Sequence, residues 1–228
     1  SKDIVAGWLN LATGAMSALY LQPVSGSIVN STDLVQAMVV ESTGPDTFIV
    51  GGMELSTGDA AGQHAYLVRA NALYKIAMYC VRYVPAASVS VRRALRGAAL
   101  PTSIARGVVR TDSSLYMIVD TFAPGANASV AVLHVNLITG VIIKQVVVRS
   151  LNGSLACADI ASIDLLLLIA CVVQYSHAEI FPLLLTVDLS LSFKELPPGF
   201  VREEENALVA QSVPFRASVL PISDQNSV

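Results

Sequence analysis

The sequence predicts an all-β fold, and three observations support this prediction. Apolar residues make up 54% of the 228 residues, whereas only 14% are charged. The apolar residues gather in runs of about five to eight, rich in Val, Ile, Leu and Tyr, between clusters of Gly, Ser, Asn and Asp. These runs have almost no helical periodicity. Short apolar runs between turn-forming residues are typical of strands, so we expect a succession of β-hairpins.

The expected strands recur as units along the chain. A pair at 4–8 and 17–21 resembles a second pair at 49–53 and 64–68, and further pairs lie at 115–120 with 129–133 and at 165–170 with 181–187. Additional apolar runs lie at 34–40, 104–109, 141–146, 155–160, 193–196 and 207–213. A full unit therefore holds four short strands.

Four strands per unit and a repeat of about 45 to 68 residues are typical of β-propeller blades, whose sheets bury both faces against their neighbours. Burial on both faces also explains strands without polar alternation, such as the run 165–173. We therefore expect a β-propeller-like array of four-stranded antiparallel blades in a single domain, 1–228. The expected blades are 207–218 with 3–30, 34–82, 103–148 and 154–196, with an insertion at 83–102.

The order of the strands predicts how this array ends. The chain opens at the second strand of a blade and finishes with an extra first strand. Residues 207–218 are thus expected to pair with 3–30 and to close a ring of four blades, which leaves no open sheet edge. There are two alternatives: the chain is a segment of a longer propeller, or two chains complete one ring.

Two stretches carry a resemblance to a known class of repeats. Residues 46–52 (DTFIVGG) and 64–71 (HAYLVRAN), joined by a loop of small residues, resemble the extracellular β-propeller repeats of many bacterial and protist surface proteins. The similarity extends over most of 3–196 and is best in 46–71. It implies a scaffold without catalytic residues.

The composition excludes several classes of protein. A net charge of −3 and a pI near 5.5 argue against a protein that binds nucleic acid through its phosphates. A mean hydropathy of +0.61 excludes an intrinsically disordered chain. The longest apolar run, 165–173, is about half as long as a membrane-spanning helix requires, so no transmembrane segment is expected.

Three Asn-x-Ser/Thr sequons lie in expected loops, at Asn30, Asn127 and Asn152. We expect them to carry N-linked glycans, which implies a secretory route and an extracellular or cell-surface location. Glycans also help to solubilise a surface with few charges. The alternative is coincidence in a turn-rich sequence.

The insertion carries a cluster of positive charge. Between Arg82 and Arg110 there are basic residues and no acidic ones, and a short helix at 90–99 would place Arg92, Arg93 and Arg96 on one side. We expect these three arginines to bind an acidic protein partner, a carboxylated or sulfated glycan, or a neighbouring subunit. The alternative is a solvated loop.

No motif predicts catalysis, a cofactor or a metal. The sequence holds no Gly-x-Ser-x-Gly elbow and no phosphate-binding Gly-rich loop, and its three histidines lack metal-ligand spacing. Four aspartates recur at turns before strands, where Asx turns explain them: Asp3, Asp46, Asp112 and Asp164.

The three cysteines, Cys80, Cys157 and Cys171, are expected to be buried free thiols. A hairpin turn at 162–163 would place Cys157 opposite Leu168, with Cys171 on the other face. A bridge between Cys157 and Cys171 therefore requires a bulge.

The leading hypothesis is a non-enzymatic extracellular module that binds a protein partner or assembles with itself, as the glycosylated repeating subunit of a fibre or coat. A chain with low charge and much apolar surface needs subunit contacts or glycans to cover it. The alternative is a lectin-like or glycan-processing propeller, with a site at the mouth of the ring formed by the recurrent aspartates with Trp8, Tyr20 and Tyr66. A third hypothesis is an accessory subunit of an intracellular assembly, docked through the insertion.

Overall fold

The chain forms strands and no helix over the residues that the structure describes. The computed structural model describes residues 4–23, 32–40, 44–55, 62–74, 76–85, 102–112, 114–123, 125–203, 208–213 and 215–220. These residues contain sixteen strands in four antiparallel sheets, so the prediction of an all-β fold is confirmed.

The strands are β1 (Ile4–Leu9), β2 (Met16–Pro23), β3 (Thr32–Val40), β4 (Asp46–Leu55), β5 (Gly62–Asn71), β6 (Ile76–Pro85), β7 (Thr102–Arg110), β8 (Leu115–Phe122), β9 (Ser129–Val135), β10 (Ile142–Ser150), β11 (Ser154–Ile163), β12 (Leu166–Gln174), β13 (Ile180–Asp188), β14 (Phe200–Glu203), β15 (Leu208–Ser212) and β16 (Phe215–Leu220). Within the described ranges, no helix has the length and the apolar character that a membrane crossing demands.

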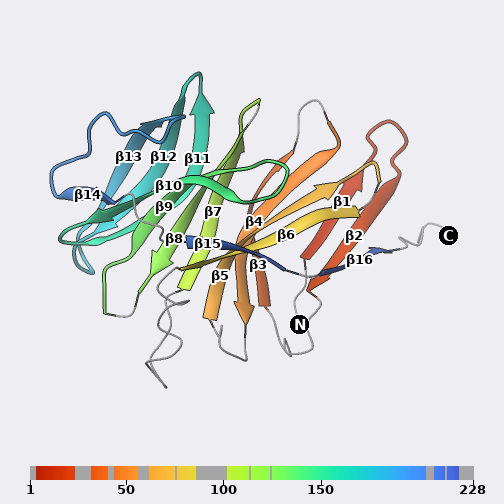
Figure 1. Cartoon of the computed structure of the whole chain (residues 1–228), viewed down its shortest axis with the longest axis horizontal. Helices are drawn as coiled ribbons and strands as arrows, with labels where there is room; N and C mark the ends of the chain where they lie inside the picture. The colour runs from red at the N-terminus through yellow and green to blue at the C-terminus, as the bar shows by residue number, and fades with distance from the viewer. Residues whose placement is uncertain are drawn as a thin grey trace.

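Each sheet begins as a run of consecutive hairpins. β3–β6 and β7–β10 are four-stranded meanders, β11–β13 is a three-stranded meander, and β1–β2 is a single hairpin. The last three strands then return past the earlier sheets in reverse order, because β14 pairs with β10, β15 with β6 and β16 with β2 (Figure 1). Three of the four sheets therefore gain one strand from the C-terminal part of the chain.

The sheet β11–β13 gains no such strand among the described residues. Residues 193–196, which were expected to form its fourth strand, lie in a loop. Pro197 and Pro198 follow directly, and because proline has no backbone N–H it cannot donate a ladder hydrogen bond. The prediction of a strand at 193–196 is thus wrong, and this sheet keeps three strands.

The sheets stack face to face. Leu115 and Met117 of β8 pack in one core with residues of β4, β5 and β6, whereas Tyr116 and Ile118 of the same strand pack in a second core with residues of β11–β13. A third, smaller core joins β1 to the sheet that contains β4 and β5. Because side chains alternate across a strand, the β7–β10 sheet buries both of its faces.

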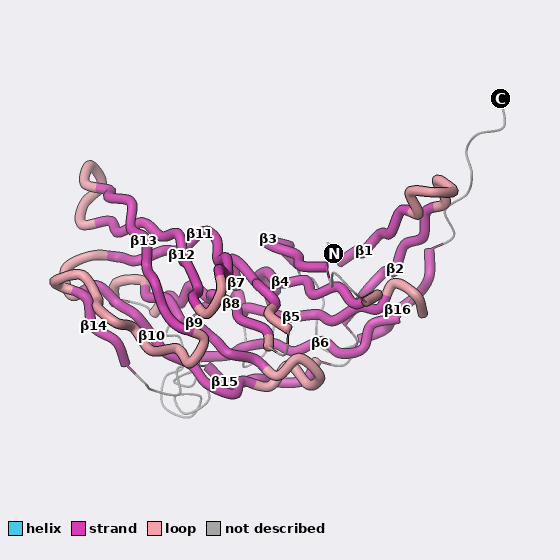
Figure 2. Tube along the Cα trace, turned by 90° about the horizontal axis from the view of Figure 1, so that it is seen from above, coloured by secondary structure: helices cyan, strands magenta, loops and turns pink. Residues whose placement is uncertain are grey.

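The stacked sheets follow an arc whose two ends, β13 and β1, lie apart (Figure 2). Pairing of the chain ends is confirmed, since β16 pairs with β2. The C-terminal partner of β2 begins only at Phe215, however, and Leu208–Ser212 pairs with β6. Among the described residues no strand joins the first sheet to the last, so the closed ring of four blades is not confirmed.

Candidate interaction surface

The sheet β11–β13 buries only one of its faces. Leu167, Ile169 and Cys171 of β12 are buried. Ala170 and Val172, which alternate with them along the strand, are exposed. The prediction that the run 165–173 is buried on both faces is therefore wrong. We call the exposed side the outer face; it comprises Ala156, Ala161, Ile163, Leu166, Leu168, Ala170, Val172, Ile180, Pro182, Leu184 and Thr186, which oppose one another in register.

The outer face is apolar although it faces solvent. Val172 is 42% exposed, Ile180 55% and Leu184 63%. The polar members of the same registers lie at the margins. Asp159 is on the edge strand β11 and Asp188 at the end of β13, and Ser154 and Gln174 lie at the ends of β11 and β12. Monomeric proteins seldom leave a contiguous apolar sheet face uncovered, so this face has the character of an interaction surface.

The edge of this sheet is less suited to interaction than its face. β13 forms the outer edge of the sheet in the described chain, and Pro182 lies within it. Proline offers no N–H, so a strand added along β13 would lack a hydrogen bond at that position. The sheet therefore favours face-to-face packing over the addition of a strand.

The opposite end of the arc also leaves apolar residues uncovered. Ala6 and Trp8 of β1 pack toward the core that is shared with β4 and β5. Leu9 and Met16, which lie opposite each other in the β1–β2 hairpin, are 52% and 60% exposed. Both ends of the stacked sheets thus present apolar side chains.

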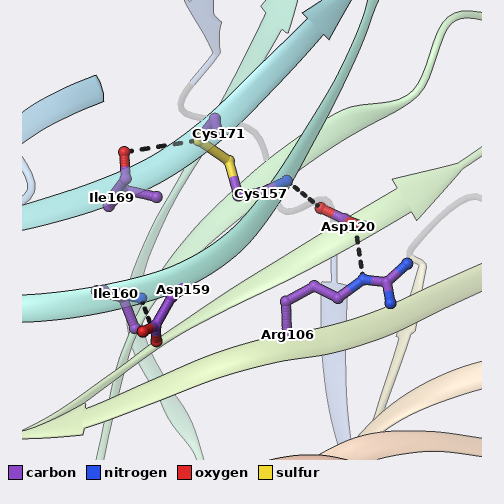
Figure 3. The surroundings of a disulfide bond; sticks show 7 residues. All are labelled: Arg106, Asp120, Cys157, Asp159, Ile160, Ile169 and Cys171. Carbon is purple, nitrogen blue, oxygen red and sulfur yellow. Dashed lines mark hydrogen bonds and ion pairs between the residues drawn. A yellow bond between two sulfur atoms is a disulfide. The ribbon is translucent and has the colours of Figure 1, made fainter. Parts of the chain in front are cut away.

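Cys157 and Cys171 form a disulfide, contrary to the expectation of free thiols (Figure 3). The β11–β12 hairpin turns at Asp164 and Leu165, and a regular ladder from this turn would place Ala158 opposite Cys171. A bulge after Cys157 shifts the register by one residue and brings Cys157 opposite Cys171. The bulge that a bridge required is therefore present.

An ion pair between the half-buried Arg106 and the buried Asp120 lies beside the disulfide. Asp120 of β8 is fully buried; its Oδ1 accepts a 3.1 Å hydrogen bond from the backbone N–H of Cys157, and its Oδ2 accepts one of 2.8 Å from Nε of Arg106 (Figure 3). Burial raises the pKa of Asp120, against the lowering effects of the Cys157 N–H and Arg106. This carboxyl group joins β7, β8 and β11.

A cavity of about 430 Å³ adjoins this cluster. Its walls are formed by Arg106 and Asp120 on one side and by both half-cystines and their strand neighbours on the other: Ala156, Ala158, Ala170 and Val172. Ala170 and Val172 also belong to the outer face, so the cavity lies at the border of that face.

The structure brings two of the three sequons together. Asn127 and Asn152 are both exposed in loops, and the backbone N–H of Ala128, next to Asn127, donates a 3.3 Å hydrogen bond to Oγ of Ser154, the third residue of the Asn152 sequon. Asn30 lies outside the described residues, as do Arg92, Arg93 and Arg96.

The recurrent aspartates do not converge on one site. Asp46 is buried, where it pairs with Arg69 and accepts a 2.6 Å hydrogen bond from Nδ2 of Asn71, so the Asx-turn interpretation is wrong for this residue. Asp112 and Asp164 are exposed, and Asp164 adopts a positive φ of 52° in the β11–β12 turn. Asp3 lies outside the described residues.

The aromatic residues of the alternative glycan site are also separate. Tyr66 is fully buried and Trp8 is half-buried. The side chain of Tyr20 is not among those that the structure describes. In the part of the chain that the structure describes, no group of three His, Cys, Asp or Glu side chains is placed to hold a metal ion.

Sequence reasoning missed Asp120 as a site residue. A signal existed, because Asp120 is an acidic residue at the end of an apolar strand where the second copy has glycine. Comparisons of this chain with protein-family models, with curated proteins and with solved structures find no match.

Proposed function

We propose that this chain is a non-enzymatic binding and structural module, located outside the cell or on its surface, which assembles with further copies of itself. The observation that carries this proposal is the uncovered apolar outer face of β11–β13. Inside the chain, the apolar faces of the two central sheets are covered by neighbouring sheets. A second copy would continue the same sheet-on-sheet packing.

The arrangement of copies that this proposal favours is end to end. The outer face of β11–β13 in one copy would pack on the β1–β2–β16 sheet of the next, where Leu9 and Met16 are exposed. Contacts between unlike surfaces form a ring where the rotation closes and a fibre where it does not. A ring of this kind would be a β-propeller whose blades come from more than one chain, and N-linked glycans at Asn30, Asn127 and Asn152 would solubilise its periphery.

The size of the surface sets the concentration at which assembly is expected. Three strands of about nine residues cover roughly 400 Å² in plan, or about 800 Å² over both partners, which is below the roughly 1,200 Å² that stable interfaces bury and in the range of weak, transient ones. Assembly should therefore be visible at high micromolar concentration and weaken on dilution.

Light scattering on the purified, deglycosylated chain tests the proposal. The wild type is expected to show a mass that rises with concentration, and Leu184→Lys on the outer face should abolish the rise. Ile138→Lys is the matched control, since Ile138 is 72% exposed in the turn between β9 and β10, which belongs to one of the two central sheets. A wild type that stays monomeric at high concentration would show that self-assembly is wrong and would favour a different partner.

A further inference from the structure

We propose that the Cys157–Cys171 disulfide is an exchangeable bond, and that the cavity beside it admits a small thiol that reduces the bond in the folded protein. This proposal does not rest on self-assembly; because Ala170 and Val172 of the cavity wall also belong to the outer face, reduction is followed at low micromolar concentration, where the chain is expected to be monomeric. It rests on the position of the disulfide in the β-ladder, on the cavity that both cysteines line, and on the ion pair on the opposite wall.

The position of the disulfide makes it dispensable for strand pairing. Cys157 and Cys171 are direct partners in the β11–β12 ladder, which continues on both sides of them from Ser154↔Gln174 to Ile163↔Leu166. The bond closes a sequence separation of only 14 residues, so it constrains the unfolded chain less than a longer loop would. Reduction therefore leaves the sheet paired, as a reversible step requires.

The cavity gives access that the outer surface does not. Cys157 and Cys171 are only 3% and 6% exposed, yet both line the cavity of about 430 Å³. Cavities of about 300 to 1,000 Å³ are typical of small-molecule sites. A thiol of the size of glutathione thus has room to lie in the cavity against the two half-cystines.

The opposite wall holds the groups that keep Cys157 in place. Asp120 fixes the backbone N–H of Cys157, and Arg106 fixes the carboxylate of Asp120. Both act as positioning residues, because they hold β11 at the bulge against β7 and β8.

The exchange takes place in two balanced steps. The thiolate of a first small thiol attacks Sγ of one cysteine; a mixed disulfide forms, the Sγ–Sγ bond breaks, and its electron pair stays on the other Sγ, which takes up a proton. A second thiolate attacks the small-thiol sulfur of the mixed disulfide and releases a symmetrical disulfide and the second protein thiol. Two electrons pass from two small thiols to the protein.

The test follows reduction of the folded, full-length chain by glutathione, with iodoacetamide to trap new thiols and mass spectrometry to count them. We expect two new alkylated cysteines, a rate proportional to glutathione concentration, and an unchanged strand signal in circular dichroism. Val172→Phe, which fills the cavity, should slow reduction about tenfold by blocking access. Ala170→Leu is a second filling variant should Val172→Phe fail to fold, and Ile138→Lys is the control with the wild-type rate.

Two results would overturn the proposal. One is a reduction rate that is independent of glutathione concentration and equal to the rate of global unfolding, which means that the bond is reached only in the unfolded chain. The other is an unchanged rate in a folded cavity-filling variant. Urea-induced unfolding rates measured on the same samples separate these cases.

Discussion

The hydroxyl group of Tyr83 in β6 donates a 2.7 Å hydrogen bond to the carbonyl oxygen of Gly140 in the turn between β9 and β10. The same turn accepts two further hydrogen bonds from the neighbouring sheet. The hydroxyl of Tyr79 in β6 and a guanidinium nitrogen of Arg69 in β5 both donate to the carbonyl oxygen of Leu137. The β9–β10 turn is thus fixed on the neighbouring sheet, which aligns the two central sheets of the arc.

Replacing Gly140 should reveal how closely this turn packs. Gly140 has a φ of +72°, and a Cβ there would lie 2.8 Å from Cγ2 of Val81 and 3.0 Å from the Tyr79 ring. We expect Gly140→Ala to lower the free energy of unfolding by about 3 kcal/mol, from backbone strain and overpacking together. Gly125→Ala is the control, because Gly125 has a φ of +75° with nothing within 4 Å, and strain alone should cost about 1 kcal/mol. Equal losses in urea titrations would contradict the close packing.

The buried Asp120 should make stability depend on pH. An unfolded aspartate loses its proton near pH 3.8, whereas burial raises the pKa of Asp120, so the folded state binds more protons above pH 3.8. The free energy of unfolding should therefore fall as pH rises from 3.8 through the raised pKa of the folded protein. Asp120→Asn, which keeps an oxygen acceptor for Cys157, should show a smaller fall in urea titrations across this window. The same fall in both proteins would be inconsistent with a raised pKa.

His134 should titrate below its ordinary range. Burial lowers the pKa of His134 from 6.5, and the positive charge of Lys144 adds to the effect. An unfolded histidine therefore binds its proton more readily than the folded one, and stability should decline as pH drops below 6.5. In NMR titrations, Lys144→Gln is expected to move the pKa of His134 upward while leaving it under 6.5, since burial remains the larger cause. No movement would rule out a contribution from Lys144.

The exposed sequons offer a direct test of the secretory route. Asn127 and Asn152 are both exposed and their loops are hydrogen-bonded to each other through Ala128 and Ser154. Intact mass spectrometry of the chain secreted from eukaryotic cells should show glycans that are lost one at a time in Asn127→Gln and Asn152→Gln. A secreted wild type with the bare polypeptide mass would refute glycosylation.

The local pattern of the sequence was enough to predict most of the strands and the two-sided burial of the central sheet. The run around Leu115 and Met117 is apolar at every position because both of its faces are covered. The run 165–173 looks the same in sequence, yet only one of its faces is covered, because the apolar character of a run does not show whether another sheet packs on it. The run 207–213 predicted the strand β15 but not its partner β6, and β14 was not separable from a loop by pattern, because the partners of both strands lie far away in the sequence.

The features around the disulfide depended on single residues. One extra residue, Ala158, determines whether Cys157 opposes Cys171, and the position of a bulge is not encoded in hydrophobic periodicity. Asp120 stood out as an acid in an apolar strand, but its partner Arg106 lies on another strand and only the fold brings the two together.

Sedimentation of mixed variants tests the end-to-end assembly most directly. Leu184→Lys blocks the outer face and leaves the β1–β2 end intact, whereas Leu9→Lys does the reverse. Each variant alone is expected to be monomeric, and an equimolar mixture is expected to form a one-to-one dimer, because one intact pair of surfaces remains. A mixture that stays monomeric, or a Leu9→Lys variant that assembles like the wild type, would contradict the account.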